Sequence, residues 1–314
     1  MIKRIIKQFI RKMLGYNSLR NEIKNLKLCI GHLCVENLKR KIEEGKIKTI
    51  NDAEFRIFSQ FGEDGIICFL IETLEIPNKI FVEFGVETYE EANTRFLLEY
   101  YNYKGLIIEA NRNYVEEIKT KDIVWRHSLE IVNEFVTREN INSILEKTGF
   151  VGDIALLSID IDGMDYWIWD AIDIISPRIV ICEYNGLFGY KKSIVVPYNP
   201  NFDRFKAHYS GLYFGASLKA LVDLGRKKGY AFVGCNLNEN DAFFVRKDVL
   251  ANSILKEVSI EEGYKSPLSR QSRDRQGKLT FLSGVKQIKL IEECIVYDLE
   301  LQKFVRIKEI LNEL

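Results

Sequence analysis

The chain has 314 residues, of which 46% are hydrophobic and 29% are charged, close to the averages of globular proteins. Its 45 Lys and Arg residues equal its 45 Asp and Glu residues, so the overall charge favours no polyanionic partner such as nucleic acid. This length and composition exclude a mostly disordered chain and predict one large domain with extensions.

Six cysteines are scattered without the CxxC spacing typical of redox or zinc sites, which indicates reduced thiols and a cytoplasmic setting. No stretch approaches ~18 uninterrupted apolar residues, so the sequence predicts no membrane-spanning helix.

Two helical patterns open the chain. Apolar residues between Ile2 and Met13 recur at helical spacing among lysines and arginines, which predicts a basic amphipathic helix. A second helix is expected from Leu19 to about Glu44. One face of this second helix carries Ile23, Leu26, Ile30, Leu33 and Cys34. Residues 1–44 could therefore pack on the rest of the chain, contact a membrane surface peripherally or mediate self-association.

From residue 79 onward, short apolar runs alternate with longer amphipathic segments. Continuous apolar strands separated by helices are typical of a parallel sheet with helices on both faces. The expected strands lie at 79–85, 104–110, 122–128, 154–162, 178–185, 230–236 and 241–248. A helix from Ser217 to Lys228 precedes the last two strands, which follow each other closely. The pattern predicts a Rossmann-like α/β fold with a seven-stranded, mostly parallel sheet.

Three regions are expected along the chain. Residues 1–50 would form a basic helical extension, and residues 51–248 the Rossmann-like domain. Residues 249–314 would form a C-terminal appendage with strands and a turn, which could act as a lid over a substrate.

A glycine turn marks the first predicted ligand contact. The strand around Phe84 ends at Gly85 just before a helix, which lets the backbone turn tightly and approach a ligand. A pyrophosphate needs the full GxGxxG pattern, whereas here Glu87, Glu90 and Glu91 follow and would repel phosphate. These acids tolerate a sulfonium and an ammonium group, which favours S-adenosylmethionine over NAD.

A second acid lies at the end of the next strand. Glu109 can accept hydrogen bonds there from both hydroxyls of a ribose, as acids at this position do in dinucleotide-binding folds. Together with Gly85 one βα unit earlier, it predicts a nucleoside-containing cofactor.

These motifs carry a family resemblance. The run Ser59-Gln60-Phe61-Gly62-Glu63-Asp64, followed by FVEFGVE, Asn93-Thr94-Arg95 and GLIIEAN, resembles FkbM-type and related sugar O-methyltransferases over residues 57–248. The resemblance implies a class I methyltransferase sheet, in which the last strand is antiparallel, and S-adenosylmethionine as cofactor. It also implies that Gln60 and Gly85 face the methionine end, Glu109 the ribose, and the segment His127-Ser128 the adenine. The predicted cofactor-binding residues are Gln60, Glu83, Gly85, Glu109, Ala110, His127, Ser128 and Asp160.

Carboxylates gather after the fourth and fifth predicted strands. Asp160, Asp162 and Asp165 follow the fourth strand, and Glu183 ends the fifth. They could hold a hard cation such as Mg²⁺ or Ca²⁺, or form a hydrogen-bonded turn in which Asp162 or Asp165 caps the next helix. Macrocin-type sugar methyltransferases, which use Mg²⁺, have a similar Asp-rich turn. This partial resemblance implies Asp160, Asp162 and Glu183 as metal ligands.

The acceptor side offers two groups of candidates. Methyl transfer to a hydroxyl needs a base, for which His208 is the first candidate and Asp160 and Tyr209 are alternatives. In the basic segment 265–278, Arg270 and Arg273 either stay solvated or bind an anionic acceptor.

The predicted function is therefore an S-adenosylmethionine-dependent O-methyltransferase. Its acceptor would be a small polar molecule, in particular an anionic (phosphorylated or nucleotide-linked) sugar of surface-glycan or secondary-metabolite biosynthesis. The alternatives are an NAD(P)-dependent oxidoreductase on a Rossmann fold and a non-catalytic Rossmann-like scaffold in a glycan-assembly complex.

Overall fold

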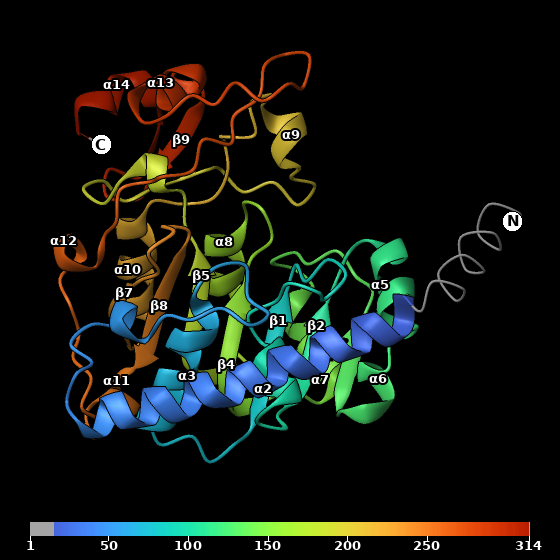
Figure 1. Ribbon diagram of the computed structural model, residues 1–314. Coiled ribbons are helices and arrows are strands. Elements are labelled where there is room, and N and C mark those ends of the chain that lie inside the picture. The colour runs from blue at the N-terminus through green and yellow to red at the C-terminus, as the bar shows by residue number, and fades with distance from the viewer. Residues whose placement is uncertain (1–15, 314) are drawn as a thin grey trace, which may run out of the picture.

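The computed structural model describes residues 16–313. The basic helix predicted over residues 2–13 lies outside this range. The second predicted helix is present as α2, Tyr16–Glu43, a long helix that runs along one side of the domain (Figure 1). No helix among residues 16–313 combines the length and the apolar character that crossing a bilayer requires.

A seven-stranded sheet forms the centre of the molecule. Its strands are β1 Ile80–Phe84, β2 Lys104–Ile108, β3 Leu129–Val132, β4 Gly152–Ile159, β5 Ile175–Glu183, β7 Tyr230–Cys235 and β8 Asp241–Arg246. The spatial order is β3-β2-β1-β4-β5-β8-β7, and β8 is antiparallel to both of its neighbours while the other pairs are parallel. This order, with the last strand inserted antiparallel beside β5, confirms the predicted Rossmann-like sheet of the class I methyltransferase type.

Helices cover both faces of the sheet. One face carries α2 and α3 (Glu63–Thr73), α4 (Arg95–Glu99), α5 (Arg112–Lys119), α6 (Ile123–Arg126) and α11 (Lys247–Leu250). The other face carries α7 (Ile141–Thr148), α8 (Asp165–Ala171), α10 (Leu218–Lys227) and α12 (Ile260–Gly263). Successive strand residues point to opposite faces, so Phe81 and Ile107 belong to the first core, and Val82 and Leu106 to the second. Both faces of the sheet are therefore covered, as expected for a parallel sheet.

The third strand lies later in the chain than predicted. Residues 122–128 were expected to form it, but Ile123–Arg126 form one helical turn and the strand is Leu129–Val132. The side chain of Arg126 pairs with Asp122 over 2.9 Å, one turn earlier, and Trp125 is 74% exposed. An ion pair at this spacing supports a helical turn, and the backbone N–H of Arg126 donates to the carbonyl oxygen of Asp122 over 3.1 Å.

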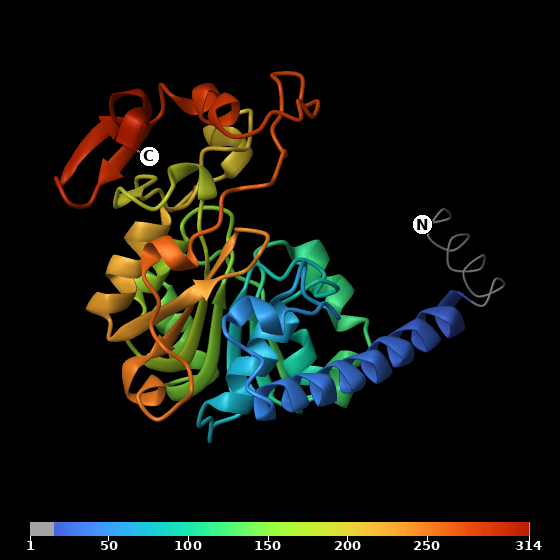
Figure 2. The ribbon, with the colours of Figure 1, turned by 60° about the vertical axis from the view of Figure 1, so that its left-hand side comes forward.

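The C-terminal part builds a second, smaller unit. Strand β9 (Ile295–Asp298) pairs with β10 (Lys303–Arg306) on one side and, on the other, with β6 (Ile194–Val195) from the connection after β5, which gives a three-stranded sheet. We call residues 186–216, with α9 (Arg204–Ala207), and residues 285–313, with α13 (Val285–Ile288) and α14 (Ile307–Ile310), the cap. Its buried core includes Phe188, Ile194, Leu212, Ile291, Val296 and Ile307. Figures 1 and 2 show the cap above the ends of the strands of the main sheet.

Candidate functional site

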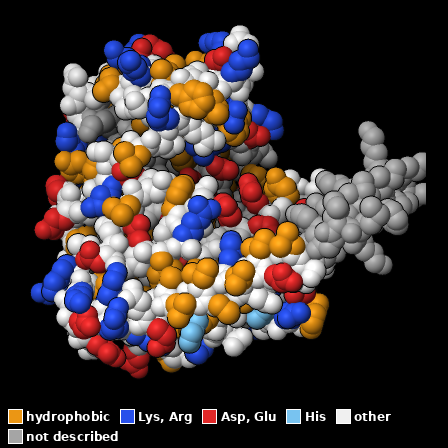
Figure 3. All heavy atoms as spheres, viewed as in Figure 1, with side chains coloured by type: hydrophobic (Ala, Val, Ile, Leu, Met, Phe, Trp, Pro, Cys, Tyr) orange, Lys and Arg blue, Asp and Glu red, His pale blue; other side chains and the backbone are white. Residues whose placement is uncertain are grey.

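A cavity of about 680 Å³ lies between the carboxyl ends of the main strands and the cap. The ends of β1, β2, β4 and β5 contribute Gly85, Glu109, Asp160 and Glu183, and the cap contributes Leu212 among others. In the space-filling view a hollow separates the cap, at the top, from the rest of the domain (Figure 3). The volume is in the range of sites for small molecules, and the position is where open α/β sheets bind ligands.

The glycine turn after β1 is present and requires glycine. Gly85 has φ of +72°, and a Cβ atom there would collide with the backbone carbonyl oxygen of Asp160. Its N–H donates to the carbonyl oxygen of Ile108 over 3.2 Å. The turn is therefore held between β2 and β4, and its backbone lines the cavity.

Glu109 is fixed at the end of β2 by backbone hydrogen bonds. Its carboxylate accepts from the N–H of Glu87 over 2.8 Å and from the N–H of Asn111 over 2.7 Å. Burial raises the pKa of Glu109, and these N–H groups oppose that shift because they favour the charged form. The side chain of Asn133 donates to the carbonyl oxygens of Glu109 and Ala110, and both residues line the cavity.

The segment Ser59–Asp64 forms a turn around a buried carboxylate. Asp64 accepts hydrogen bonds from the backbone N–H groups of Ile57, Phe58 and Ser59 at 2.7–2.8 Å. This turn leaves Gln60 exposed at the cavity.

Glu83 is the acid within β1. It accepts from the backbone N–H of Asn93 over 2.8 Å, and from both the N–H and the hydroxyl of Thr94. The side chain is buried, and this burial raises the pKa of Glu83 to about 7, against the effect of its hydrogen bonds. Glu83 lines the cavity, and its hydrogen bonds hold Asn93 and Thr94, which follow the glycine turn, against β1.

The two residues predicted to lie near the adenine, His127 and Ser128, are not among those that line the cavity. His127 ends α6, and the carbonyl of Ser128 accepts from the N–H of Gly105 at the start of β2, so neither lies among the residues that line the cavity. Because the third strand is shifted along the chain, the segment after it is 133–136. Phe135, half exposed, and Val136 line the cavity there.

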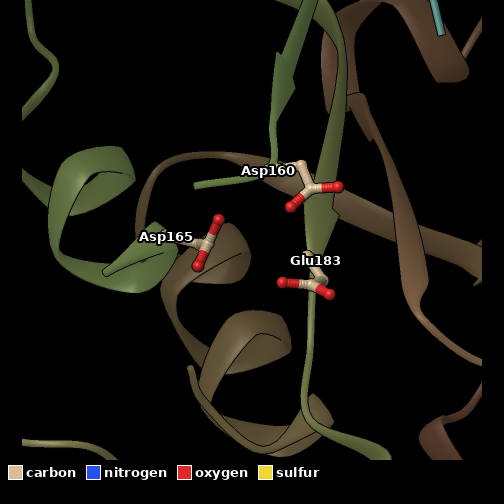
Figure 4. Close-up of side chains that lie close together, drawn as sticks. All are labelled: Asp160, Asp165 and Glu183. Atoms are coloured by element: carbon tan, nitrogen blue, oxygen red, sulfur yellow. The ribbon is translucent and has the colours of Figure 1, made fainter. Parts of the chain in front are cut away.

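Three carboxylates meet at the ends of β4 and β5. Oxygens of Asp160, Asp165 and Glu183 lie within 4.8 Å of one another, and the side chains point toward a common centre (Figure 4). Asp165 also accepts from the N–H groups of Ile161 and Gly163 over 2.9 and 3.0 Å. We call Asp160, Asp165 and Glu183 the carboxyl cluster.

The carboxyl cluster differs from the predicted metal set by one residue. Asp162 does not join it, because its carboxylate pairs with Arg204 over 2.8 Å. Asp165 takes its place, and its hydrogen bonds come from N–H groups that precede α8 and not from the first turn of that helix. Desolvation and mutual repulsion raise the pKa values of Asp160 and Glu183, and burial raises that of Asp165. Such a group either holds protons at neutral pH or binds a cation.

The first candidates for the base lie outside the cavity. Nδ1 of His208 lies 2.7 Å from the hydroxyl of Ser210, and its ring is 4.3 Å from that of Tyr209 between centroids. The guanidinium of Arg275 sits 4.8 Å from the centroid of the Tyr209 ring. Neither His208 nor Tyr209 is among the residues that line the cavity.

The predicted acceptor arginines also lie elsewhere. Arg270 donates to the carbonyl oxygen of Phe281 over 2.8 Å, and Arg273 to that of Gly277 over 2.9 Å. Their neighbours Ser269 and Gln271 line the cavity, but the two arginines do not. Arg270 lies between these two residues in the chain, and Arg273 lies beyond them in an isolated bridge with Leu279.

Acidic residues dominate the cavity wall. The acids that line it are Glu83, Glu87, Glu91, Glu109, Glu134, Asp160, Asp162, Glu183, Glu239 and Asp241. Within the described residues of that wall, the single Lys or Arg is Arg204, which the sequence pattern did not single out. Its guanidinium pairs with Asp162 and lies 3.7 Å from the centroid of the Phe214 ring. The cavity therefore suits a cationic or neutral ligand and not a pyrophosphate.

No family model and no curated protein matches this sequence. Solved structures resemble parts of it. The N-terminal domain of EvdMO1 with SAH bound is 11% identical, with a TM-score of 0.34 over 53% of this chain and 72% of that one. A putative caffeoyl-CoA O-methyltransferase from Staphylococcus aureus is 12% identical, with a TM-score of 0.38 over 68% of this chain and 91% of that one. PKMT2 from Rickettsia typhi is 8% identical, with a TM-score of 0.36 over 56% and 51%. These similarities are weak, and the fold is assigned from the strand order and directions of the sheet.

Proposed function

We propose that this chain is an S-adenosylmethionine-dependent O-methyltransferase whose acceptor is a small neutral molecule with hydroxyl groups, such as a sugar. The observation that carries the proposal is the coupling of the glycine turn at Gly85 to the carboxylate of Glu109 within an acidic cavity. An acid at this strand end suits a ribose, and an acidic wall without a phosphate cradle suits a positively charged sulfonium.

The cavity residues fit this cofactor. Glu109 would accept hydrogen bonds from the ribose, and Phe135 and Val136 offer an apolar surface for the adenine ring. Gln60 and the backbone at Gly85 would contact the methionine part. When bound, the cofactor supplies a methyl group on a positively charged sulfur, which makes that carbon electrophilic.

The carboxyl cluster lies at the ends of β4 and β5, and we infer that it acts on the acceptor. Asp160 lies at the end of β4 beside the glycine turn, and its raised pKa brings it closer to neutrality, where a general base works best. We propose that Asp160, in its ionised form, would take the proton of the acceptor hydroxyl as the oxygen–carbon bond forms and the bond between the methyl carbon and the cofactor sulfur breaks.

A divalent cation is the alternative occupant of the cluster. Asp160, Asp165 and Glu183 would hold it, and one oxygen of Glu183 is buried without a hydrogen-bond partner. Carboxylate oxygens are the ligands that Mg²⁺ prefers, and the ion would polarise the acceptor hydroxyl.

The acceptor we propose is neutral rather than anionic. A phosphorylated acceptor would need free cations in the cavity, but Arg270 and Arg273 lie outside it and Arg204 is already paired. The resemblance of residues 57–248 to FkbM-type enzymes supports a sugar of surface-glycan or secondary-metabolite biosynthesis.

Isothermal titration calorimetry tests the cofactor. The purified chain should bind S-adenosylmethionine and S-adenosylhomocysteine, and should show no heat with NAD or NADP. Binding of NAD with no response to either sulfur compound would overturn the proposal and favour an oxidoreductase. No binding of any of these ligands would favour a non-catalytic scaffold.

A further inference from the structure

Helix α2 is apolar on two opposite sides. On one side Val35 and Leu38 are buried against the domain, and Gly31 packs against the ring of Phe96. The other side exposes Leu19, Ile23, Leu26, Ile30 and Leu33. Between 48% and 68% of each of these five residues is accessible to solvent. Figure 3 shows hydrophobic side chains gathered along the path that α2 follows in Figure 1. A helix that only covers its own domain needs one apolar side, so the second side requires a partner.

The spacing of this apolar stripe is that of a coiled coil. The intervals between its five residues are four, three, four and three, which places the leucines at heptad position d and the isoleucines at position a. Isoleucine at a with leucine at d favours two parallel strands. The stripe ends where the next a and d positions become Asn37 and Arg40.

The sequence before the described residues keeps the same heptad register. Ile2 and Phe9 fall at position a, and Ile5 at position d. Tyr16 also falls at position a, whereas Lys12 falls at position d, so the apolar repeat toward the start of the chain is interrupted once.

The charged residues at positions g and e also favour a parallel pair of helices. Glu22 and Glu36 occupy position g, while Lys27 and Lys41 occupy position e, each five residues after one of the acids. In a parallel pair, g of one helix faces e of the next heptad in the other, so each glutamate would face a lysine. In an antiparallel pair g faces g and e faces e, so like charges would meet.

The lysines remain able to pair across an interface. Nζ of Lys27 lies 5.3 Å from the centroid of the Phe58 ring. Nζ of Lys41 donates to the carbonyl oxygen of Asp52 over 3.1 Å. An ammonium group has three donors, so each lysine can also bond to a carboxylate of a second chain. The third g and e pair is Cys29 and Cys34.

We propose that the apolar stripe of α2 is the core of a parallel, two-stranded coiled coil with a second copy of this chain. The domain lies on the opposite side of α2 from the stripe, so two copies can pair without a clash between their bodies. The cap stands away from α2 (Figures 1 and 2), so both cavities stay open to solvent.

Sedimentation equilibrium of the full chain tests this proposal. The wild type should have twice the monomer mass, and the double variant Ile23→Lys/Ile30→Lys should have the monomer mass. Asn25→Lys, an exposed position on the same helix but outside the stripe, should keep the doubled mass. A wild type that is monomeric at every accessible concentration, or a double variant that stays dimeric, would overturn the proposal. Because the readout is mass, its outcome is independent of cofactor binding.

Charge exchange tests the pairing with variants that leave the stripe intact. Glu22→Lys/Glu36→Lys and Lys27→Glu/Lys41→Glu should each shift toward the monomer mass alone. A mixture of the two should recover the doubled mass, because every g and e pair then has opposite charges. A mixture that stays monomeric would contradict the parallel pairing.

Orientation follows from cross-linking with a short bismaleimide. In a parallel pair the link joins Cys29 of one chain to Cys34 of the other, so Cys29→Ser and Cys34→Ser should each abolish it. A link that persists in Cys34→Ser would indicate an antiparallel pair through Cys29 and overturn the proposed orientation. A monomeric wild type that binds vesicles with anionic lipids, and loses this binding in Ile23→Lys/Ile30→Lys, would assign the stripe to a membrane surface instead.

Discussion

The backbone N–H of Glu87 donates a hydrogen bond of 2.8 Å to the carboxylate of Glu109, which ties the turn after β1 to the end of β2. The same carboxylate is the one proposed to hold the ribose. The two contacts proposed for the cofactor, at the turn and at the acid, therefore depend on each other.

Removing this acid should weaken cofactor binding. Glu109→Ala loses hydrogen bonds to a charged group, which typically contribute about 1.5–3 kcal/mol, so the Kd for S-adenosylmethionine should rise roughly 10- to 150-fold. Calorimetry measures the change. Glu130→Gln, at an exposed position on β3, is the matched control and should bind as the wild type does. Equal affinity in Glu109→Ala would remove Glu109 from the ribose site.

A side chain at Gly85 should disturb both the fold and the site. Gly85→Ala combines a positive φ with a collision against the backbone of Asp160, so we expect a loss of at least about 1–3 kcal/mol in the free energy of unfolding. Gly149→Ala separates the two causes, because Gly149 has a similar φ of +73° but no atom within 4 Å of its Cβ position. Urea denaturation should show a smaller loss for Gly149→Ala, with cofactor affinity unchanged. Equal losses would mean that the collision with Asp160 costs nothing.

The carboxyl cluster can be tested for cation binding without turnover. If it holds Mg²⁺, the ion should raise the Tm of the cofactor-free protein, since a ligand that binds only the folded state stabilises it. Glu183→Gln should abolish the rise, while Asp162→Asn, which faces Arg204, should retain most of it. No rise in the wild type, together with full activity in excess chelator, would leave Asp160 as a base without a metal.

The stability of the cofactor-free protein should fall as pH rises through 7. The pKa of Glu83 is about 7 in the folded state and about 4.5 when unfolded, so folding favours its protonated form. This contribution is complete below pH 4.5 and is lost as pH rises through 7, an amount of roughly 3 kcal/mol at about 1.4 kcal/mol per pKa unit.

Glu83→Gln removes that titrating group. Between pH 5 and pH 8.5, its free energy of unfolding should decrease less than that of the wild type. The Glu130→Gln variant should follow the wild type. If all three proteins gave parallel profiles, the pKa of Glu83 would be ordinary in the folded state.

The parts of the fold that follow from local patterns were predictable. The apolar runs around Val82, Ile107 and Leu157 specify buried strands, and glycine at position 85 specifies the turn. The third strand was misplaced because Ile123-Val124-Trp125 is apolar enough for a strand. Its backbone hydrogen bonds and its short-range ion pair show it to be helical, and neither is visible in the apolar pattern.

The site was predictable where strand ends define it and not where loops do. Glu109, Asp160 and Glu183 end strands, so the topology of the sheet brings them to one edge. Arg204 begins the short helix α9 in the long connection after β5, and Phe135 lies in a loop, and nothing local in the sequence indicates which residues of these segments will face the cavity. For the same reason His208 was selected for its chemistry although its segment turns its ring away from the cavity.

The cap, which forms one side of the cavity, depends on two distant segments of the chain, because β6 pairs with β9. Ile194 is buried with Val296 and Ile307, so a fragment that stops near residue 248 would expose an apolar surface in the connection after β5. Exchanging the acceptor preference of two such proteins would require both pieces to be transplanted together. Transplanting one of these segments without the other would leave β6 or β9 without its pairing partner and the cavity without part of its cap.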